Sequence, residues 1–535
     1  MPAALTYPGV YIQEVPSGVR TITGVATSIT AFVGSAAAGP TDDPVLLTSF
    51  ADYERRFGGL HVTSPLSYAV RDFYLNGGSL ALVVRVLASD AAPATIMLPG
   101  GGGPATDLVL QASSSGDWGN RLTASVDHGT DRALPRTSPP AINDQRFNLT
   151  VRYRPRPGRD EEIVETFNSV STTPGDGRFL PLVLERESAY VIVQDGVMPP
   201  ARPLFTSADG VAATSGSEGS ALGDADVTGS QGAKTGLYAL NRADLFNLLC
   251  IPPRVRDIST LPSTYTPTSA SVYQAALALC VERRAMLLVD PDPVWGSSIE
   301  SAIDNATDGR NDLNLTGPAA RNAALYFPCV RQVDPLRDNR LDTFVPSGIV
   351  AGVIARTDIQ RGVWKAPAGL DAALNGVQDL QVNLNDLENG QLNPLGINCL
   401  RSMGVNGRIV WGARTLRGAD ESADEYKYLP VRRLALFLEE SLYRGTQWVV
   451  FEPNDEPLWA QVRLNMGAFM QGLFRQGAFQ GATPRDAYFV KCDNQTTTQA
   501  DINLGILNII VGFAPLKPAG FVVIQIQQMA GQIPT

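Results

Sequence analysis

The sequence predicts an α/β (α+β) multidomain fold with an inserted β-rich domain, and three observations support this prediction. Apolar strand-like runs alternate with amphipathic helices before residue 88 and again after residue 236. Between these regions, short alternating runs and turn residues dominate. A strand-like segment also lies near each end of the chain, with no other strand close to it in sequence.

The length and charge of the chain indicate several domains and no general affinity for nucleic acid. A chain of 535 residues is too long for one hydrophobic core. Its formal net charge of −10 opposes binding to a polyanion. We expect an N-terminal arm (1–25), an α/β segment (26–88), an inserted β-rich outer domain with flexible linkers (89–235), a central α/β domain (236–400), a C-terminal domain (401–515) and a C-terminal arm (516–535).

The first α/β segment opens and closes on an apolar strand, at residues 27–34 and 80–86. Two helices are expected between these strands, at residues 51–57 and 65–75. Asn76 and the two glycines after it are expected to end the second helix. This order of elements predicts a small α/β unit.

The middle of the chain is expected to be a β-rich domain on flexible connectors. Two low-complexity segments frame it, residues 91–104 and 206–232, and their composition predicts mobile links. Short alternating runs predict strands at residues 108–111, 122–126, 147–153, 163–167 and 190–193.

The third region returns to alternating helix and strand. A helical stretch is expected from residue 237, leading into the apolar run that ends at residue 249. Further elements are expected as a helix at 271–283, a buried strand at 285–290, and strand and helix elements at 323–327 and 350–354.

After residue 400, a strand at 407–411 and two amphipathic helices are expected. The first helix, at residues 430–444, should end at Gly445. The second should be capped by Asp455, with Pro457 in its first turn. The expected buried stripe of the second helix comprises Leu458, Val462, Met466, Phe469 and Leu473.

Both terminal segments are expected to pair with strands of neighbouring copies. The C-terminal segment at residues 521–526 is rich in β-branched residues. Lys517 is the only charged residue from 502 to 535. Such a run is an aggregation hazard as a free sheet edge, and insertion into a neighbour's sheet removes that hazard. The residues expected to take part are Val10, Tyr11, Ile12, Gln13, Glu14, Val15, Phe521, Val522, Val523, Ile524, Gln525 and Ile526.

The sequence contains no assembled catalytic constellation, so we expect a protein that is not an enzyme and has no cofactor. Asp290 and Asp292 follow a buried strand, where metal-binding carboxylates can sit, but the prolines at 291 and 293 favour a turn. A metal-dependent hydrolase that uses these two carboxylates stays open as a remote alternative. The five cysteines lack CxxC spacing, which fits reduced, buried thiols in a cytoplasmic protein. No stretch reaches 18 apolar residues, so no membrane span is expected.

Short motifs spread over nearly the whole chain are similar to those of one protein family. They lie in the opening arm (7–14), in the Gly-Asp-Trp-Gly-Asn turn (116–120), and in the central region (247–252 and 287–290). The most specific block lies near the end, at residues 477–481, 487–493 and 514–523. In these segments the chain resembles tail sheath proteins of contractile machines, which include myophage tails, R-type tailocins and contractile injection systems.

The resemblance implies a C-terminal α/β sheath core domain that is completed by strands exchanged between subunits. Subunits are then expected to stack as hexameric rings around an inner tube and to contract, driving the tube through a target envelope. The implied partners are further copies of this chain, the inner tube protein, baseplate proteins and tail-terminator or cap proteins. Assembly in the bacterial cytoplasm and a final place in a virion tail or contractile injection particle are implied as well.

The resemblance also implies a tube-contacting helix in the C-terminal domain, and the helix at residues 456–475 is the candidate. Arg463 and Arg475 are expected to meet acidic groups of the tube, with Lys491 nearby in sequence. The alternative for these residues is a solvated helix face. The alternative for the whole chain is another ring- or filament-forming structural protein, of the shell or surface-layer type.

Overall fold

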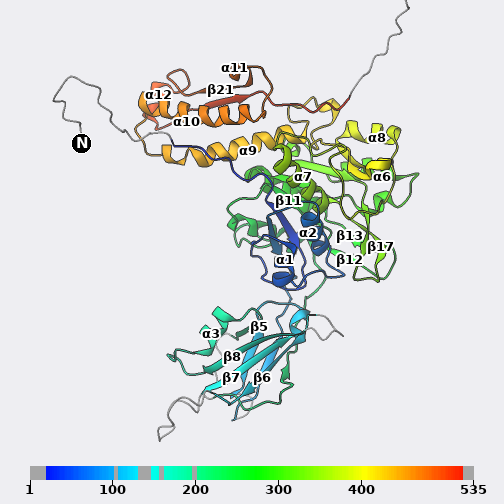
Figure 1. The fold of residues 1–535 in the computed structure, drawn as a ribbon, viewed down its shortest axis with the longest axis vertical. Coiled ribbons are helices and arrows are strands. Elements are labelled where there is room, and N and C mark those ends of the chain that lie inside the picture. Colours follow the sequence, from blue (N-terminus) through cyan, green and yellow to red (C-terminus); the bar gives the residue numbers. More distant parts are fainter. Residues whose placement is uncertain (1–19, 102–105, 131–145, 156–161, 195–201, 522–535) are drawn as a thin grey trace, which may run out of the picture. The chain divides into compact units, whose positions relative to one another are not determined.

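The computed structural model describes residues 20–101, 106–130, 146–155, 162–194 and 202–521 (Figure 1). The chain divides into two compact units. Among the described residues, the small unit comprises 20–27, 357–366 and 428–521, and the large unit comprises the rest. The chain therefore passes from one unit to the other after residues 27, 356, 366 and 427.

The large unit is built on an eight-stranded sheet with the order β2-β3-β1-β11-β14-β15-β19-β20. The strands from β3 to β19 in this order are parallel, and the two edge strands are antiparallel. Every residue of β1, β3, β14 and β15 is buried, as expected for apolar runs in a parallel sheet. The strand bounds are β1 Thr30–Gly34, β2 Val45–Leu47, β3 Ala81–Arg85, β11 Leu248–Cys250, β14 Met286–Val289, β15 Ala323–Phe327, β19 Ile397–Ser402 and β20 Arg408–Val410.

The helices around this sheet begin where the sequence supplies a cap. Ser49, Ser64 and Ser269 each accept a hydrogen bond from a first-turn amide of α1, α2 and α5. These three predicted helices are confirmed, and the helical stretch expected from residue 237 is a 3-10 helix, Gly236–Arg242. The helix bounds are α1 Phe50–Phe57, α2 Pro65–Leu75, α4 Asp224–Thr228, α5 Ala270–Glu282, α6 Ala302–Asp312, α7 Ser347–Arg361 and α8 Asp386–Leu392.

The β-rich part of the large unit contains two antiparallel sheets, β4-β5-β9 and β10-β6-β7-β8. All five predicted strands are confirmed. Strands β4 and β10 were not predicted, because they lie inside the two segments interpreted as mobile links. The bounds are β4 Thr95–Leu98, β5 Leu108–Ala112, β6 Leu122–Asp127, β7 Arg146–Tyr153, β8 Ile163–Ser171, α3 Leu180–Glu187, β9 Val191–Val193 and β10 Val211–Ala212.

The entry and the exit of the β-rich part are hydrogen-bonded to each other. Ala92 and Ser217 exchange both backbone hydrogen bonds, with N···O distances of 3.0 and 2.9 Å. The Ser220 amide donates to the Asp90 carboxylate at 2.9 Å. Beyond this point the chain returns to the α/β core, where Val227 of α4 is buried.

The Gly-Asp-Trp-Gly-Asn turn packs tightly against other residues of the β-rich part. Trp118 lies in the 3-10 helix Asp117–Arg121, and its ring meets that of Tyr153 edge-on at 5.6 Å between centroids. A Cβ on Gly119 would lie 2.7 Å from the Cβ of Ala94 and 2.9 Å from that of Ala112. Trp118 therefore supplies a large buried ring, and Gly119 beside it lets the chain approach Ala94 and Ala112 where no side chain would fit.

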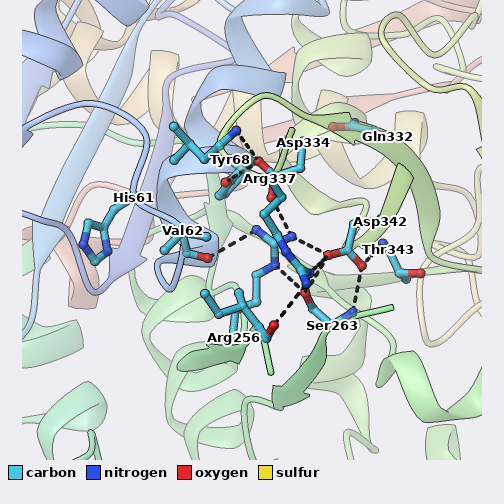
Figure 2. A network of polar contacts seen from close by, with 12 residues as sticks. His61, Val62, Tyr68, Arg256, Ser263, Gln332, Asp334, Arg337, Asp342 and Thr343 are labelled. Carbon is cyan, nitrogen blue, oxygen red and sulfur yellow. Dashed lines mark hydrogen bonds and ion pairs between the residues drawn. The ribbon is translucent and has the colours of Figure 1, made fainter. Parts of the chain in front are cut away.

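A buried polar network joins α2 to two hairpins of the large unit, β12–β13 and β16–β17 (Figure 2). The Arg256 guanidinium pairs with Asp334 at 2.7 Å and with Asp342 at 2.6 Å, and all three side chains are fully buried. The Tyr68 hydroxyl of α2 donates to the other oxygen of Asp334 at 2.9 Å. The strands are β12 Val255–Asp257, β13 Thr264–Thr266, β16 Val330–Asp334, β17 Arg340–Phe344 and β18 Asp379–Leu380.

Further donors stabilise the charged form of the Asp342 carboxylate. The amide and hydroxyl of Ser263 donate to Asp342 at 2.8 and 2.5 Å, and Arg337 pairs with the same carboxylate at 2.7 Å. Burial opposes the charge on Asp342, but the hydrogen bonds from Ser263 and Arg256 outweigh burial and lower its pKa. A buried ion pair of this kind depends on every partner being in place.

The small unit contains two long helices and a two-stranded sheet. Both long helices were predicted, and Asp455 caps the second by accepting from the Leu458 amide. Four residues of the predicted buried stripe are buried and Phe469 is partly buried. The bounds are α9 Leu429–Gly445, α10 Glu456–Arg475, α11 Pro484–Ala487, β21 Tyr488–Lys491, α12 Gln499–Asn503 and β22 Ile510–Phe513.

Helix α9 ends at Gly445, as predicted, but Gly445 does not take the left-handed conformation that often ends a helix. A Cβ at this position would lie 2.6 Å from Cγ2 of Ile22. The missing side chain at Gly445 therefore leaves space for Ile22.

Candidate assembly site

The candidate assembly site is the two-stranded antiparallel sheet of the small unit. Tyr488 lies opposite Phe513 and Lys491 lies opposite Ile510. Among the residues that the structure describes, no third strand belongs to this sheet. A two-stranded sheet is marginal by itself, and its outer edges leave backbone donors and acceptors open to another strand.

The register shows which backbone groups point outward. The Ala514 amide donates to the Ala487 carbonyl at 2.8 Å, so this pair faces inward. Inward and outward pairs alternate along an antiparallel ladder. Val490 and Val511, which lie opposite each other three pairs further on, therefore direct their N–H and C=O groups to the two outer edges.

One face of this sheet is anchored in the small unit and the other is apolar and exposed. Val490 and Val511 pack against a buried cluster that includes Leu438 of α9 and Met470 of α10. On the opposite face, Phe489 and Ile510 are each 49% exposed. The sheet therefore presents both open edges and unburied apolar side chains.

Most of the predicted exchange residues lie outside the described part of the chain. This holds for Val10, Tyr11, Ile12, Gln13, Glu14 and Val15, and for Val522, Val523, Ile524, Gln525 and Ile526. Phe521 is described, and it is 76% exposed. Strand exchange by these residues stays a prediction.

Of the predicted tube-contact residues, Arg463 is engaged inside its own unit. Its guanidinium pairs with Glu456 at 2.6 Å and also donates to the carbonyl of Cys492. Arg463 thereby ties the first turn of α10 to the residue after β21. About a third of the Arg463 side chain is exposed.

Arg475 and Lys491 are both exposed. Arg475 is the last residue of α10. The ammonium of Lys491 lies 5.8 Å from the ring centroid of Phe489, on the exposed face of the sheet. Contact of these cations with a tube stays a prediction.

The two carboxylates considered for a hydrolase have structural partners in the large unit. Asp290 follows β14 and accepts hydrogen bonds from the amide and hydroxyl of Ser347, the first residue of α7, at 2.8 and 2.7 Å. Burial raises the pKa of Asp290 to about 7, although the bonds from Ser347 favour the charged form. Asp292 accepts from the Val294 amide at 3.0 Å and so begins a 3-10 turn, as its neighbouring prolines predicted.

Neither a metal centre nor a membrane span is found in the described ranges. There, no three or more His, Cys, Asp or Glu side chains are grouped in a way that could hold a metal ion. None of the described helices combines the length and the apolar content needed to cross a bilayer. A pocket of about 210 Å³ lies beside Asp290, and Tyr273 and Asp312 also line it.

Comparison with known sequences points to one family. Residues 421–529 match the model of the phage tail sheath C-terminal domain. The tail sheath protein of Burkholderia phage BcepMu is 24% identical over 497 residues, which cover 88% of this chain and 87% of that protein. The tail sheath protein of Enterobacteria phage T4 is 24% identical over 249 residues, and the match spans only 36% of that protein and 44% of this chain.

Solved structures share the fold. The sheath of the PVC extracellular contractile injection system, in its contracted state, has a TM-score of 0.57 at 21% identity and covers 98% of both chains. The contracted helical sheath of the anti-feeding prophage has a TM-score of 0.54 at 22% identity, with 98% of this chain and all of that chain covered. The sheath tail protein of Listeria innocua has a TM-score of 0.59 at 14% identity, with 93% and 96% covered. The predicted resemblance and mixed α/β fold are thus confirmed: the chain has the fold of tail sheath proteins, and residues 421–529 match the phage tail sheath C-terminal domain.

Proposed function

We propose that this chain is the structural subunit of a contractile sheath, which assembles as stacked hexameric rings around an inner tube. The observation that carries this proposal is the match of residues 421–529 to the phage tail sheath C-terminal domain. The open-edged β21–β22 sheet lies inside that matched region. Contraction of the sheath drives the tube through a target envelope, and the subunit itself is structural rather than catalytic.

In this proposal, terminal arms of neighbouring subunits add strands to the outer edges of β21 and β22. A donated strand of six residues makes about five backbone hydrogen bonds, each with a net contribution of about 0.5–1.5 kcal/mol. Burial of apolar surface such as Phe489 and Ile510 adds about 25 cal/mol per Å². Such links let subunits rotate as rigid bodies while they stay tethered.

Proline at an outward-facing edge position tests strand addition. Val490→Pro and Val511→Pro each remove an N–H that does not serve the β21–β22 ladder, so the subunit should still fold. We expect folded chains that form no ordered sheath in negative-stain electron micrographs. Val490→Thr and Val511→Thr are the matched controls, because they change the side chain and keep the N–H. Normal sheaths from both proline variants would refute strand addition at these edges.

Removal of the C-terminal arm tests the same idea from the donor side. A chain lacking residues 519–535 should give soluble or aggregated subunits and no ordered sheath, whether or not the tube protein is present. The residues expected to form the donated strand are then missing, while the acceptor sheet of β21 and β22 is kept. Ordered sheaths from this deletion would contradict the arm's role.

The contact with the inner tube is proposed to involve the exposed cations near the end of α10 and on β21. Arg463→Glu combined with Arg475→Glu should impair assembly of the extended sheath on the tube. Since Arg463 also binds Glu456 inside the unit, Arg475→Glu alone separates tube contact from folding. Arg485→Glu is a matched control, because Arg485 is also exposed and lies on α11. Normal assembly of the double variant on the tube would sink the proposed contact.

The remaining partners in this proposal are the baseplate proteins and the tail-terminator or cap proteins at the two ends of the sheath. Subunits would assemble in the bacterial cytoplasm, and the finished sheath would belong to a virion tail or a contractile injection particle. Particles purified with the native chain should show a sheath around an axial tube in electron micrographs. A shell or flat lattice without such a tube would instead favour a different structural assembly.

A further inference from the structure

A short segment ahead of the first strand lies along helix α9 inside the small unit (Figure 1). We call residues 20–27 the strap. At one end, the Arg20 guanidinium lies over the Trp448 ring, 4.5 Å from its centroid. In the middle, the Val25 amide donates to the Ser441 hydroxyl at 3.2 Å. The strap is therefore bound to Ser441 of α9 and to Trp448, three residues beyond the end of this helix.

Two glycines, one on each partner, allow the strap to lie close to α9. Ile22 of the strap is buried against Gly445, where any Cβ would collide with it. Conversely, a Cβ on Gly24 of the strap would lie 2.8 Å from the ring of Phe437 on α9. The strap and the helix thus each have a glycine where the other has a large side chain. This complementarity fixes the register of the strap against the helix, since sliding by one residue would set side chain against side chain.

A buried ion pair fixes the end of the strap. Arg433 of α9 binds both oxygens of Asp358 at 2.8 and 2.5 Å, and both side chains are less than 5% exposed. The Thr27 hydroxyl donates to Asp358 at 2.6 Å, and Arg433 donates to the Thr27 carbonyl at 2.8 Å. We call these three residues the clamp. Each member bonds to the other two, so removing one leaves a buried charge or polar group without its partner.

The clamp gathers three segments close to where they enter the small unit. Thr27 is the last residue before the chain passes to the large unit. Asp358 is the second residue after the crossing at 356, in the last turns of α7, and Arg433 follows the crossing at 427 by six residues. The strap is thus fastened at the point where the chain leaves for strand β1.

We propose that the strap is a fixed part of the small unit, docked on α9 of its own chain and held there by the clamp. Tension on the N-terminal arm then reaches the fold through α9, before it reaches β1. This mechanical consequence rests on the proposed sheath function, whereas docking of the strap is a property of the single chain. The strap buries only one large apolar side chain, Ile22, so the clamp is the part that makes the docking stable.

A disulfide between strap and helix tests the docking. The ideal Cβ of Gly445 lies 3.1 Å from the Cβ of Ile22, a few tenths of an ångström below the usual disulfide range of about 3.5–4.5 Å. Ile22→Cys also relieves the contact, because a single sulfur replaces the two γ-carbons of Ile22 that lie 2.6 and 2.8 Å from that Cβ. The five native cysteines are buried, so they should not compete. We expect rapid intramolecular cross-linking of this full-length variant under mild oxidation at low protein concentration.

A matched control places the cysteine of the strap at position 23 instead of position 22. Thr23 is exposed, so the variant Ile22→Ala/Thr23→Cys/Gly445→Cys should cross-link at least ten-fold more slowly. Equal rates for the two pairs, no cross-link, or cross-links mainly between chains would overturn docking on the same chain. Because this readout uses free chains, it is independent of whether a sheath forms.

Variants of the clamp test what holds the strap. Asp358→Asn and Thr27→Val, each added to the Ile22→Cys/Gly445→Cys pair, should slow cross-linking at least ten-fold while circular dichroism stays unchanged. Arg485→Gln, remote from the clamp in sequence, should leave the rate unchanged. Unaltered rates in both clamp variants would show that the clamp does not hold the strap. The cross-linked chain should also assemble and contract like the wild type, and loss of contraction on oxidation, reversed by reduction, would refute a strap that stays fixed.

Discussion

Replacement of the buried carboxyl of Asp290 should change how stability depends on pH. Asp290→Asn keeps the shape of the side chain, and its amide can still bond with the amide and hydroxyl of Ser347. The wild-type carboxyl has a pKa of about 7, raised from an ordinary 3.8 chiefly by burial. The folded chain therefore binds a proton at Asp290 that the unfolded chain has already released above about pH 4.

The sign and size of the effect follow from this difference in pKa. Between about pH 4 and pH 7 the folded state holds more protons, so the contribution of Asp290 to the unfolding free energy falls as pH rises. A difference of about three between two pKa values corresponds to about 4 kcal/mol. Below pH 4 and above pH 7 this contribution is constant. The amide of the Asp290→Asn variant does not titrate, so the variant should lack the fall.

Urea unfolding of unassembled chains between pH 4 and pH 8 measures the effect. We expect the free-energy difference between wild type and Asp290→Asn to change by about 4 kcal/mol over this range, in favour of the variant at high pH. Asp292→Asn is the control, since Asp292 only begins a 3-10 turn, and it should retain the wild-type profile. A difference between wild type and Asp290→Asn that varies by less than about 1 kcal/mol over this range would refute the argument.

Three further experiments test packing and charge in the two units. Asp342→Ala should lower the unfolding free energy by about 3–5 kcal/mol, because it leaves Arg256 buried with only part of its counter-charge, and urea titration at pH 7 measures the loss. Asp358→Ala should cost a similar amount, and combining it with Arg433→Met should recover part of it in a double-mutant cycle; purely additive losses would deny the coupling. Gly119→Ala should lower the melting temperature of the chain, since its Cβ has no space, and an unchanged melting temperature would contradict the close packing.

Local signals in the sequence predict most of the regular elements. Helix α2 was predicted with both ends correct, because Pro65 starts it and the Asn76-Gly77 pair ends it. Strands such as β3 and β14 were found because a continuous apolar run is typical of a buried parallel strand. In each case the deciding residues lie within a few positions of the element.

Features that depend on distant partners were not predicted. Strand β10 lies in a polar, glycine-rich segment, and its pairing with β6 depends on residues far away in sequence. Arg256 meets Asp342 across 86 residues, and Val25 meets Ser441 across 416. A single sequence places no residue of such a pair next to the other. Gly445 shows the same limit. The sequence alone does not distinguish a glycine that ends a helix in the left-handed conformation from a glycine that makes room for a distant side chain.

The candidate assembly site was predicted only in part. The sequence indicated the two terminal donors but not the sheet that would accept them, since β21 and β22 are short strands that join across a helical turn. Arg463 was predicted to meet acidic groups of a tube, and its partners Glu456 and Cys492 inside the unit were not foreseen. Seven positions separate Arg463 from Glu456, two helical turns that bring both side chains to one face of α10, and this spacing was the signal that could have indicated the pair.

The paired backbone at Ala92 and Ser217 brings the entry and the exit of the β-rich part together. Because its two ends leave the α/β core side by side, a short turn could close the gap, or a foreign domain with adjacent termini could be grafted there. Changes in size at this position need not disturb the strand order of the large sheet. Related proteins could therefore differ in the β-rich part while the eight-stranded sheet stays the same.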